Sequence, residues 1–271
     1  MIIDFHTHSF PAPVVPNAMG ELQRRFGDFV PTYDGSEDGL RQMIHTLAID
    51  YCVVLNIATN PRQQTNVNNF AAASNHGQII SFGSVHPCAA DAADELDRIK
   101  ALGLKGIKLH SDYQNFWVDD ERFFPLYRKI GELGLITVFH CGQDMGCFEP
   151  IRCTPERLAR VLPLFGDTPV VAAHMGGYCM WHDVEKHLVG KNVYFDTAYT
   201  YGNMPPEHTH RIVAAHGADR ILLGSDMPWS KTTDEARFVR SWGLSDADTR
   251  KVLGENAARL LGLPLSGGAS S

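Results

Sequence analysis

The chain opens with Met1-Ile-Ile-Asp-Phe-His-Thr-His8, an apolar run that ends in two histidines one residue apart. The run predicts a short strand over Ile2–His6, and side chains at positions i and i+2 of a strand point to the same face. His6 and His8 therefore project together, whereas helical spacing would turn them roughly 200° apart. By the same spacing, Asp4 is expected on the face of His6. Imidazole suits zinc, iron, copper or nickel, so this pair makes half of a metal site.

Short β-rich runs alternate with helical segments along the rest of the chain. The predicted strands are Ile2–His6, Tyr51–Ile57, Ile79–His86, Leu104–Leu109, Leu135–His140, Pro169–His174, Val193–Asp196 and Arg220–Ser225. The predicted helices are Glu37–Ala48, Asp91–Leu102, Glu121–Leu133, Pro155–Leu162, Val184–Val189 and Glu207–His216. Alternating strands and helices indicate βαβ units and a parallel sheet. Eight units in 271 residues predict one distorted (β/α)8 TIM barrel over residues 1–263.

A doubly wound open sheet is the alternative fold. Such a fold normally carries a Gly-rich phosphate loop after its first strand, where this chain has Thr7-His8-Ser9-Phe10-Pro11. The Pro-rich stretch 9–31 predicts a long excursion over the C-terminal face of the barrel, with a helix near Ala18–Phe26. This excursion is either functional or a solvated insertion. The small polar residues 264–271 predict a disordered tail.

Composition excludes several classes of function. The formal charge of −7, without any basic run, argues against a nucleic-acid partner or an anionic membrane surface. No apolar run approaches the ~18 residues of a membrane span. Six cysteines lie scattered without a CxxC pair, which predicts free thiols and a cytoplasmic protein. We expect a small-molecule substrate, and a homo-oligomer stays open. Because the first strand begins at Ile2, we expect neither a leader segment nor an auxiliary β-sandwich.

Histidines gather where the predicted strands end. In a barrel, catalytic groups come from the carboxyl ends of different strands. A lone histidine is usually a buried imidazole bonded to backbone, but this coincidence at several ends is hard to explain by packing. The strand-end residues include His6, His8, His86, His110, His140, His174, Asp196 and Asp226. Three nitrogens and one carboxylate, from His6, His8, His140 and Asp226, can hold a divalent metal and leave one position open for water.

The strand-end motifs carry a resemblance to a known family. They are Ile3-Asp-Phe-His-Thr-His8, Gly106-Ile-Lys-Leu-His110, Phe139-His140, Ala172-Ala-His-Met-Gly-Gly177 and Gly224-Ser-Asp-Met-Pro-Trp229. In this order they resemble the amidohydrolase superfamily, and more narrowly the amidohydrolase-2 family, which includes aminocarboxymuconate-semialdehyde decarboxylase-like enzymes. The resemblance runs from Ile2 to about Leu261. It implies one divalent metal, foremost Zn²⁺ with Mn²⁺ as the alternative, bound by His6, His8, His140 and Asp226.

The resemblance also implies roles around that metal. His174 matches a non-ligand acid/base or electrophilic residue, and its alternatives are a second-metal ligand or an outer hydrogen-bond donor. Asp226 would accept a proton from the attacking water and pass it to the leaving group. Lys108 and His110 share a strand face, and we expect them to bind substrate. A metal-bridging carbamate on Lys108 is the less favoured alternative. Arg152 could bind a carboxylate, although a surface arginine is the favoured interpretation.

Four functions are compatible with these residues, and they are given in the order in which the residues favour them. The first is metal-dependent hydrolysis of an amide, lactone or ester of a small molecule. The second is non-oxidative decarboxylation of a small unsaturated or aromatic acid. This reaction needs a cation that binds the leaving carboxylate, and near the predicted site only Lys108 or Arg152 offers one. A TatD-like nuclease would carry Gly-Glu-x-Gly-Leu-Asp, where this chain has Gly-Ile-Lys-Leu-His-Ser. A non-catalytic metal-binding module is the fourth.

Overall fold

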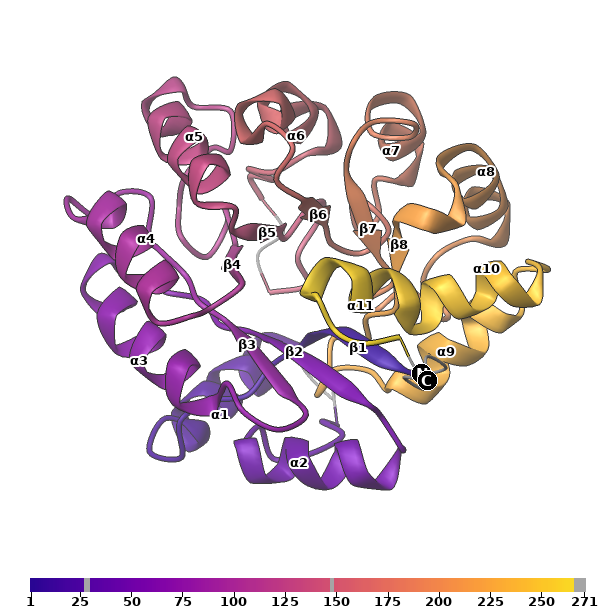
Figure 1. Ribbon diagram of the computed structural model, residues 1–271, viewed down its shortest axis with the longest axis horizontal. Helices are drawn as coiled ribbons and strands as arrows, with labels where there is room; N and C mark the ends of the chain where they lie inside the picture. Colours follow the sequence, from indigo (N-terminus) through magenta and orange to yellow (C-terminus); the bar gives the residue numbers. More distant parts are fainter. Residues whose placement is uncertain (27–29, 147–148, 266–271) are drawn as a thin grey trace, which may run out of the picture.

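The strands form a ring that the helices surround (Figure 1). The computed structural model describes residues 1–26, 30–146 and 149–265. Each predicted strand is present: β1 (Ile3–Thr7), β2 (Tyr51–Leu55), β3 (Ile79–Phe82), β4 (Gly106–Leu109), β5 (Ile136–Phe139), β6 (Val170–Ala172), β7 (Tyr194–Asp196) and β8 (Ile221–Leu222). β1 has its predicted length and lies one residue later. The others are shorter than predicted, because strand-end residues such as His140 and His174 already lie in the loops.

Neighbouring strands run parallel in two ladders, and backbone hydrogen bonds connect the two ladders at both ends. The ladders run in the orders β1-β2-β3 and β4-β5-β6-β7-β8. Gly83 donates its N–H to the carbonyl of Gly106, and Lys108 donates to that of Gly83, each at 2.9 Å, which links β3 to β4. Phe5 donates to the carbonyl of Leu223 at 2.7 Å, which links β1 to β8. The fold is therefore the predicted (β/α)8 barrel, and the open sheet is excluded.

The predicted helices are present, and the C-terminal third adds several that were not predicted. The helices are α1 (Val15–Phe26), α2 (Glu37–Thr46), α3 (Gln64–Ser74), α4 (Ala92–Ala101), α5 (Phe124–Leu133), α6 (Pro155–Val161), α7 (Trp181–His187), α8 (Pro206–His216), α9 (Thr232–Arg240), α10 (Asp246–Arg250) and α11 (Asn256–Leu261). Short 3₁₀ segments lie at Pro61–Gln63, Glu121–Phe123, Leu162–Phe165 and Ala218–Arg220, and a π-helical turn at Lys251–Glu255. Of these helices, α3, α9, α10 and α11 were not predicted.

Side-chain caps fix where several helices begin. Ser36 accepts from the N–H of Gly39 at the start of α2, and Thr154 accepts from that of Arg157 at the start of α6. Such caps satisfy backbone donors that the first helical turn leaves free. The cap at Thr154 therefore fixes where the chain re-enters a helix after the loop that follows β5.

Two apolar layers hold the barrel together. One packs the helices on the outside of the strands, and the other fills the inside. Ala257, Ala258 and Leu261 of α11 belong to the inner layer, together with Ile3 and Phe5 of β1. Residues near the start of β1 therefore pack on α11 at one end of the barrel, which leaves the opposite end for polar side chains.

An irregularity in β1 separates Asp4 from His6. The register of β1 on β2 shifts between Asp4 and Thr7. Asp4 accepts a hydrogen bond from Thr232 of α9 at 2.5 Å, whereas the His6 ring faces the interior. The expectation that these side chains point to one face is therefore wrong, because strand parity assumes a regular strand and a bulge redirects side chains.

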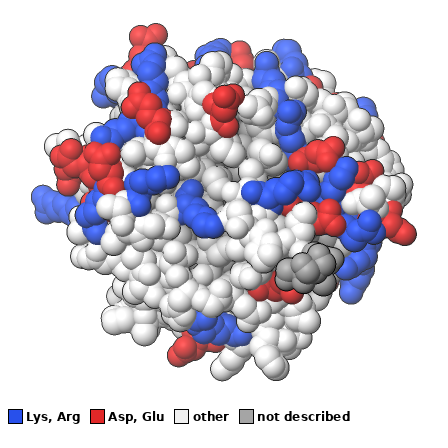
Figure 2. Space-filling view, in the orientation of Figure 1, with Lys and Arg blue, Asp and Glu red and all other residues white. Residues whose placement is uncertain are grey.

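Several sequence expectations fall partly outside the described residues. Cys52, Cys88, Cys141, Cys153 and Cys179 are free thiols, as predicted, and Cys147 lies outside the described part of the chain. Of the predicted tail, only residues 264 and 265 are described, and Leu265 is exposed. Among the described helices, none is long and apolar enough to cross a membrane. Basic and acidic side chains are interspersed on the face that Figure 2 shows.

Candidate metal centre

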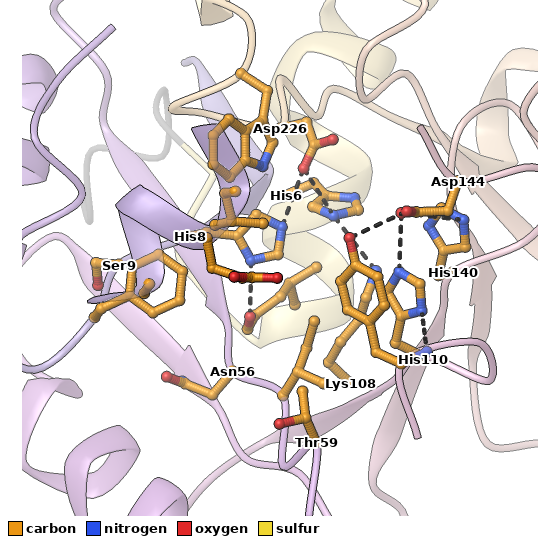
Figure 3. Close-up of a pocket in the computed structure, with 18 of the residues that line it drawn as sticks. His6, His8, Ser9, Asn56, Thr59, Lys108, His110, His140, Asp144 and Asp226 are labelled. Carbon is orange, nitrogen blue, oxygen red and sulfur yellow. Dashed lines mark hydrogen bonds and ion pairs between the residues drawn. The ribbon is translucent and has the colours of Figure 1, made fainter. Parts of the chain in front are cut away.

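A cavity of about 640 Å³ lies at the carboxyl ends of the strands. All the side chains predicted for the site line it: His6, His8, Lys108, His110, His140, His174 and Asp226. Figure 3 shows His6, His8 and Asp226 grouped together, with His110, His140 and Asp144 beside them. Arg152 instead donates to the Asn115 side chain at 2.8 Å and lies 3.6 Å from Asp112. Arg152 does not line the cavity, so the interpretation as a surface arginine describes it better.

The carboxylate of Asp226 joins the two histidines of the opening motif. Its Oδ1 lies 3.0 Å from Nε2 of His8 and 3.4 Å from Nε2 of His6. Burial alone would raise the pKa of Asp226, but the neighbouring His6 and His8 hold it well below its usual range. Asp226 is therefore ionised at neutral pH and can act as a ligand or as a base.

Nδ1 of His6 and Nδ1 of His8 each face an oxygen that can only accept a hydrogen bond. Nδ1 of His6 donates to the carboxylate of Asp196 at 2.9 Å, and Nδ1 of His8 donates to the carbonyl of Leu55 at 3.0 Å. Burial, together with the charge of Lys108, lowers the pKa of His6 far below its usual value, so its ring is neutral. In a neutral ring whose Nδ1 carries the hydrogen, Nε2 offers a lone pair. The Nε2 lone pair of His6 therefore faces a carboxylate oxygen.

The same arrangement recurs at His140 and His174. Nδ1 of His174 donates to the carbonyl of Ala198 at 2.9 Å, and Nε2 of His140 donates to that of Gln143 at 3.2 Å. The remaining nitrogens, Nε2 of His174 and Nδ1 of His140, face each other at 3.0 Å. Each of the two lone pairs needs a proton or a cation, and imidazoles oriented by outer acceptors are typical of metal ligands. The donor set therefore fits a divalent metal.

His174 lies nearer to the His6–Asp226 pair than was predicted for a residue that does not bind the metal. One nitrogen of His174, one of His6 and one carboxylate oxygen of Asp226 lie within 4.8 Å of one another. His140, the predicted ligand, forms a similar group with His110 and Asp144. The geometry thus brings both imidazoles to the centre and makes His174 a candidate ligand as well.

Backbone strain marks two of these residues. His174 has a φ of 61° and Asp226 a φ of 70°, values that residues other than glycine rarely adopt. Hydrogen bonds hold both conformations: His174 donates its N–H to Asp196 at 2.9 Å, and Asp226 donates to the carbonyl of His6 at 2.7 Å. Strain of this kind persists where the surroundings impose it and is common at functional sites.

Lys108 lies at the bottom of the cavity as a buried cation. Its Nζ is 3.4 Å from Nε2 of His6, and its side chain is 1% exposed. Burial lowers the pKa of Lys108 to about 8, while Asp196 and Asp226 oppose this shift. The ammonium can therefore bind a negatively charged oxygen that enters beside Asp226.

Sequence reasoning missed a stack of rings on the other side of the centre. Tyr113 stacks on His110 at 3.9 Å, and His110 stacks on His140 at 4.1 Å with nearly parallel planes. Asp144 accepts from Tyr113 at 3.1 Å and from His110 at 3.3 Å. A metal lies in the plane of an imidazole that binds it, so two parallel stacked rings cannot both bind one ion. His110 and Asp144 therefore position the His140 ring and do not form a second metal site with it.

Comparisons with known proteins identify the family of the chain. A model of the amidohydrolase family matches residues 3–263. The chain belongs to the amidohydrolase-2 family. No curated protein shows a significant sequence match. Membership confirms the resemblance, and metal dependence is a property of this family.

Solved structures share the fold over nearly the whole chain. An uncharacterised TIM-barrel protein from Bordetella bronchiseptica is 23% identical, with a TM-score of 0.72 and coverage of 96% of this chain and 98% of that one. A dihydroxybenzoic acid decarboxylase from a Polaromonas species, with bound manganese and an inhibitor, is 17% identical, with a TM-score of 0.70 and coverage of 96% of both chains. A candidate 2-pyrone-4,6-dicarboxylic acid hydrolase from Pseudomonas putida is 18% identical, with a TM-score of 0.69 and coverage of 97% and 98%. At such identities the likeness shows the fold alone.

Proposed function

We propose that the protein is a metal-dependent hydrolase that cleaves a lactone, ester or amide bond of a small molecule. The observation that carries this proposal is that Nε2 of His6 and Nε2 of His8 both face one oxygen of the ionised Asp226. His6, His8, His140 and Asp226 would hold one divalent ion, Zn²⁺ or Mn²⁺. When bound, such an ion polarises the substrate carbonyl and makes water more acidic.

The side chains supply the remaining chemistry. Asp226 lies at the cavity wall with its side chain 14% exposed, so its carboxylate reaches a water molecule in the cavity. It accepts the proton of that water as the oxygen attacks the carbonyl carbon, and it then donates the proton to the leaving oxygen or nitrogen. The Lys108 ammonium lies beside it and stabilises the negative charge on the carbonyl oxygen, and the His174 ring does the same when its Nε2 carries a proton. His110 would contact the bound substrate from the opposite wall.

Decarboxylation is the second candidate, and Lys108 favours it. A buried ammonium beside the centre can hold the carboxylate that leaves as carbon dioxide. Solved structures of decarboxylases share the fold, as does the candidate pyrone hydrolase. Both reactions would use a metal and a base in the same place.

A substrate screen with two readouts tests the proposal. Protein loaded with Zn²⁺ or Mn²⁺ is given lactones, aryl esters and amides, with acid release followed by a pH indicator. Hydroxybenzoates and unsaturated dicarboxylic acids are given in parallel, with carbon dioxide as the readout. We expect hydrolysis that disappears in Asp226→Asn. Carbon dioxide release without any hydrolysis would replace the hydrolase by a decarboxylase, and inactivity of the metal-loaded protein in both assays would reject both.

A further inference from the structure

The cavity extends outward from the metal centre into a second region with apolar walls. We call this region the outer chamber; it is lined by Phe10, Val14, Ala18, Leu22, Val67 and Phe70. These residues come from the β1–α1 connection, from α1 and from α3. None of them belongs to the predicted metal site. A cavity of about 640 Å³ falls within the range of pockets that enclose most of a drug-sized ligand, about 300–1,000 Å³.

Helix α1 turns its apolar stripe toward this chamber. Ala18 and Leu22 of α1 are spaced four residues apart, as are Ala18 and Val14, which directly precedes the helix. The three therefore lie along one side, and all three line the cavity. An amphipathic helix normally buries such a stripe on the protein core. No residue of the described part of α1 is buried, and Val14 is 45% exposed. The stripe therefore faces the chamber, where an apolar ligand would cover it.

The charged residues at the chamber mouth are already paired with each other. Arg25 donates to Glu21 at 3.0 Å, and Arg24 donates to the same carboxylate at 2.6 Å. The Arg25 guanidinium also lies over the ring of Tyr113, 5.6 Å from its centroid. Among the described residues that line the cavity, Arg25 is the one arginine and Lys108 is the one lysine. A charged group of the substrate is thus favoured beside Lys108 and not in the outer chamber.

We propose that the substrate carries an extended apolar group that lies in the outer chamber beneath α1, while its reacting carbonyl lies at the metal centre. This inference rests on the proposed hydrolase and names its substrate class as lactones or esters with an alkyl chain. Each methylene group that enters the chamber leaves water for an apolar wall. Chain length should therefore raise the specificity constant until the chamber is full.

A series of γ-lactones with alkyl chains of increasing length tests this inference. We expect kcat/KM to rise about three- to fourfold per methylene group. Leu22→Asp places a carboxylate in the chamber and should remove the dependence on chain length. Asn17→Asp adds the same charge to an exposed residue of α1 that does not line the cavity, and should change nothing. Ala18→Phe fills the chamber and should shorten the chain at which the rise ends.

Binding separates this inference from the proposed function. Tetrahydrofurans with the same alkyl chains lack the carbonyl group and cannot be hydrolysed, so calorimetry measures their affinity without turnover. Affinity that rises with chain length, in a protein that hydrolyses no lactone, ester or amide, would support the apolar chamber and reject the hydrolase. Hydrolysis or binding that is independent of chain length would overturn the inference, as would an equal response in Leu22→Asp and Asn17→Asp.

Discussion

Nδ1 of His6 lies 2.9 Å from Oδ2 of Asp196, and the two side chains are 1% and 0% exposed. Asp196 at the end of β7 thereby fixes which nitrogen of His6 carries the hydrogen. Its other oxygen, Oδ1, accepts the backbone N–H groups of His174 at 2.9 Å and Ala198 at 3.1 Å. One carboxylate thus orients a candidate ligand from β1 and holds the strained backbone of His174.

Asp196→Asn should therefore weaken metal binding. If the amide oxygen keeps the two backbone hydrogen bonds, the amide nitrogen faces Nδ1 of His6 and donates to it. The ring hydrogen then moves to Nε2, which loses its lone pair. We expect metal affinity to fall about 10- to 100-fold, measured by competition with a chelating dye. Asp119→Asn changes a carboxylate that pairs with Arg157 and should leave affinity unchanged. An unchanged affinity in Asp196→Asn would remove Asp196 from the centre.

Substitution of His140 and His174 assigns their roles. Following the family pattern, we expect His140→Ala to lose the metal and His174→Ala to keep it while turnover falls about 10²- to 10⁴-fold. Elemental analysis of the purified variants gives the metal content, and initial rates give the turnover. Loss of metal in His174→Ala with retention in His140→Ala would make His174 the ligand, as its position near His6 and Asp226 allows.

Lys108→Met should separate metal binding from turnover. The buried ammonium lies 3.4 Å from Nε2 of His6 and repels a cation bound there. We expect metal affinity to rise about tenfold, while kcat/KM falls about 100-fold because the charge that holds the substrate oxygen is lost. Lys129→Met on the surface, where Lys129 pairs with Asp97, is the control. A gain in turnover, or weaker metal binding, would contradict this role.

Chelation should lower both activity and stability. A metal that binds only the folded protein stabilises it by about 2.7 kcal/mol when its concentration is about 100 times its Kd. We expect a chelator to abolish turnover and lower Tm by several degrees, and equimolar Zn²⁺ or Mn²⁺ to restore both. Differential scanning calorimetry with and without chelator measures the shift. An unchanged Tm together with full activity would remove the metal from the proposal.

His216, outside the candidate site, should make stability depend on pH. Its ring stacks on Phe195 at 4.0 Å and donates from Nε2 to the carbonyl of Val193 at 3.0 Å. Burial lowers the pKa of His216 from 6.5 to about 4. The unfolded chain therefore binds the proton first as pH falls, so stability is lost between about pH 6.5 and 4 and is unaffected above that window. The loss reaches about 3 kcal/mol, measured by urea unfolding.

A matched pair of variants checks this assignment. His216→Gln should flatten the dependence of unfolding free energy on pH within that window. His45→Gln removes an exposed histidine of α2 and should leave the slope as it is in the wild type. Equal slopes in His216→Gln and the wild type would show that other groups account for the acid sensitivity.

Local pattern did not reveal every helix. Helix α3 escaped prediction because its inward face carries polar side chains such as Gln64 and Asn68, so it lacks an apolar period. Asn68 is fully buried and donates to the carbonyl of Ser84 at 2.9 Å and to Glu95 at 2.7 Å. Hydrogen bonds to residues distant in the sequence replace the apolar contacts that a periodicity argument needs.

The sequence by itself determined the barrel and the edge at which the site lies. Apolar runs alternate with helical segments, and histidines and one aspartate follow those runs, so these features depend only on neighbours in the chain. Only the tertiary structure decided which nitrogen of each imidazole is free, that Asp4 leaves the face of His6, and that α1 turns Leu22 toward the cavity. His6 and Asp196 are 190 positions apart, and a contact of that kind exists only once the barrel brings the ends of its strands together.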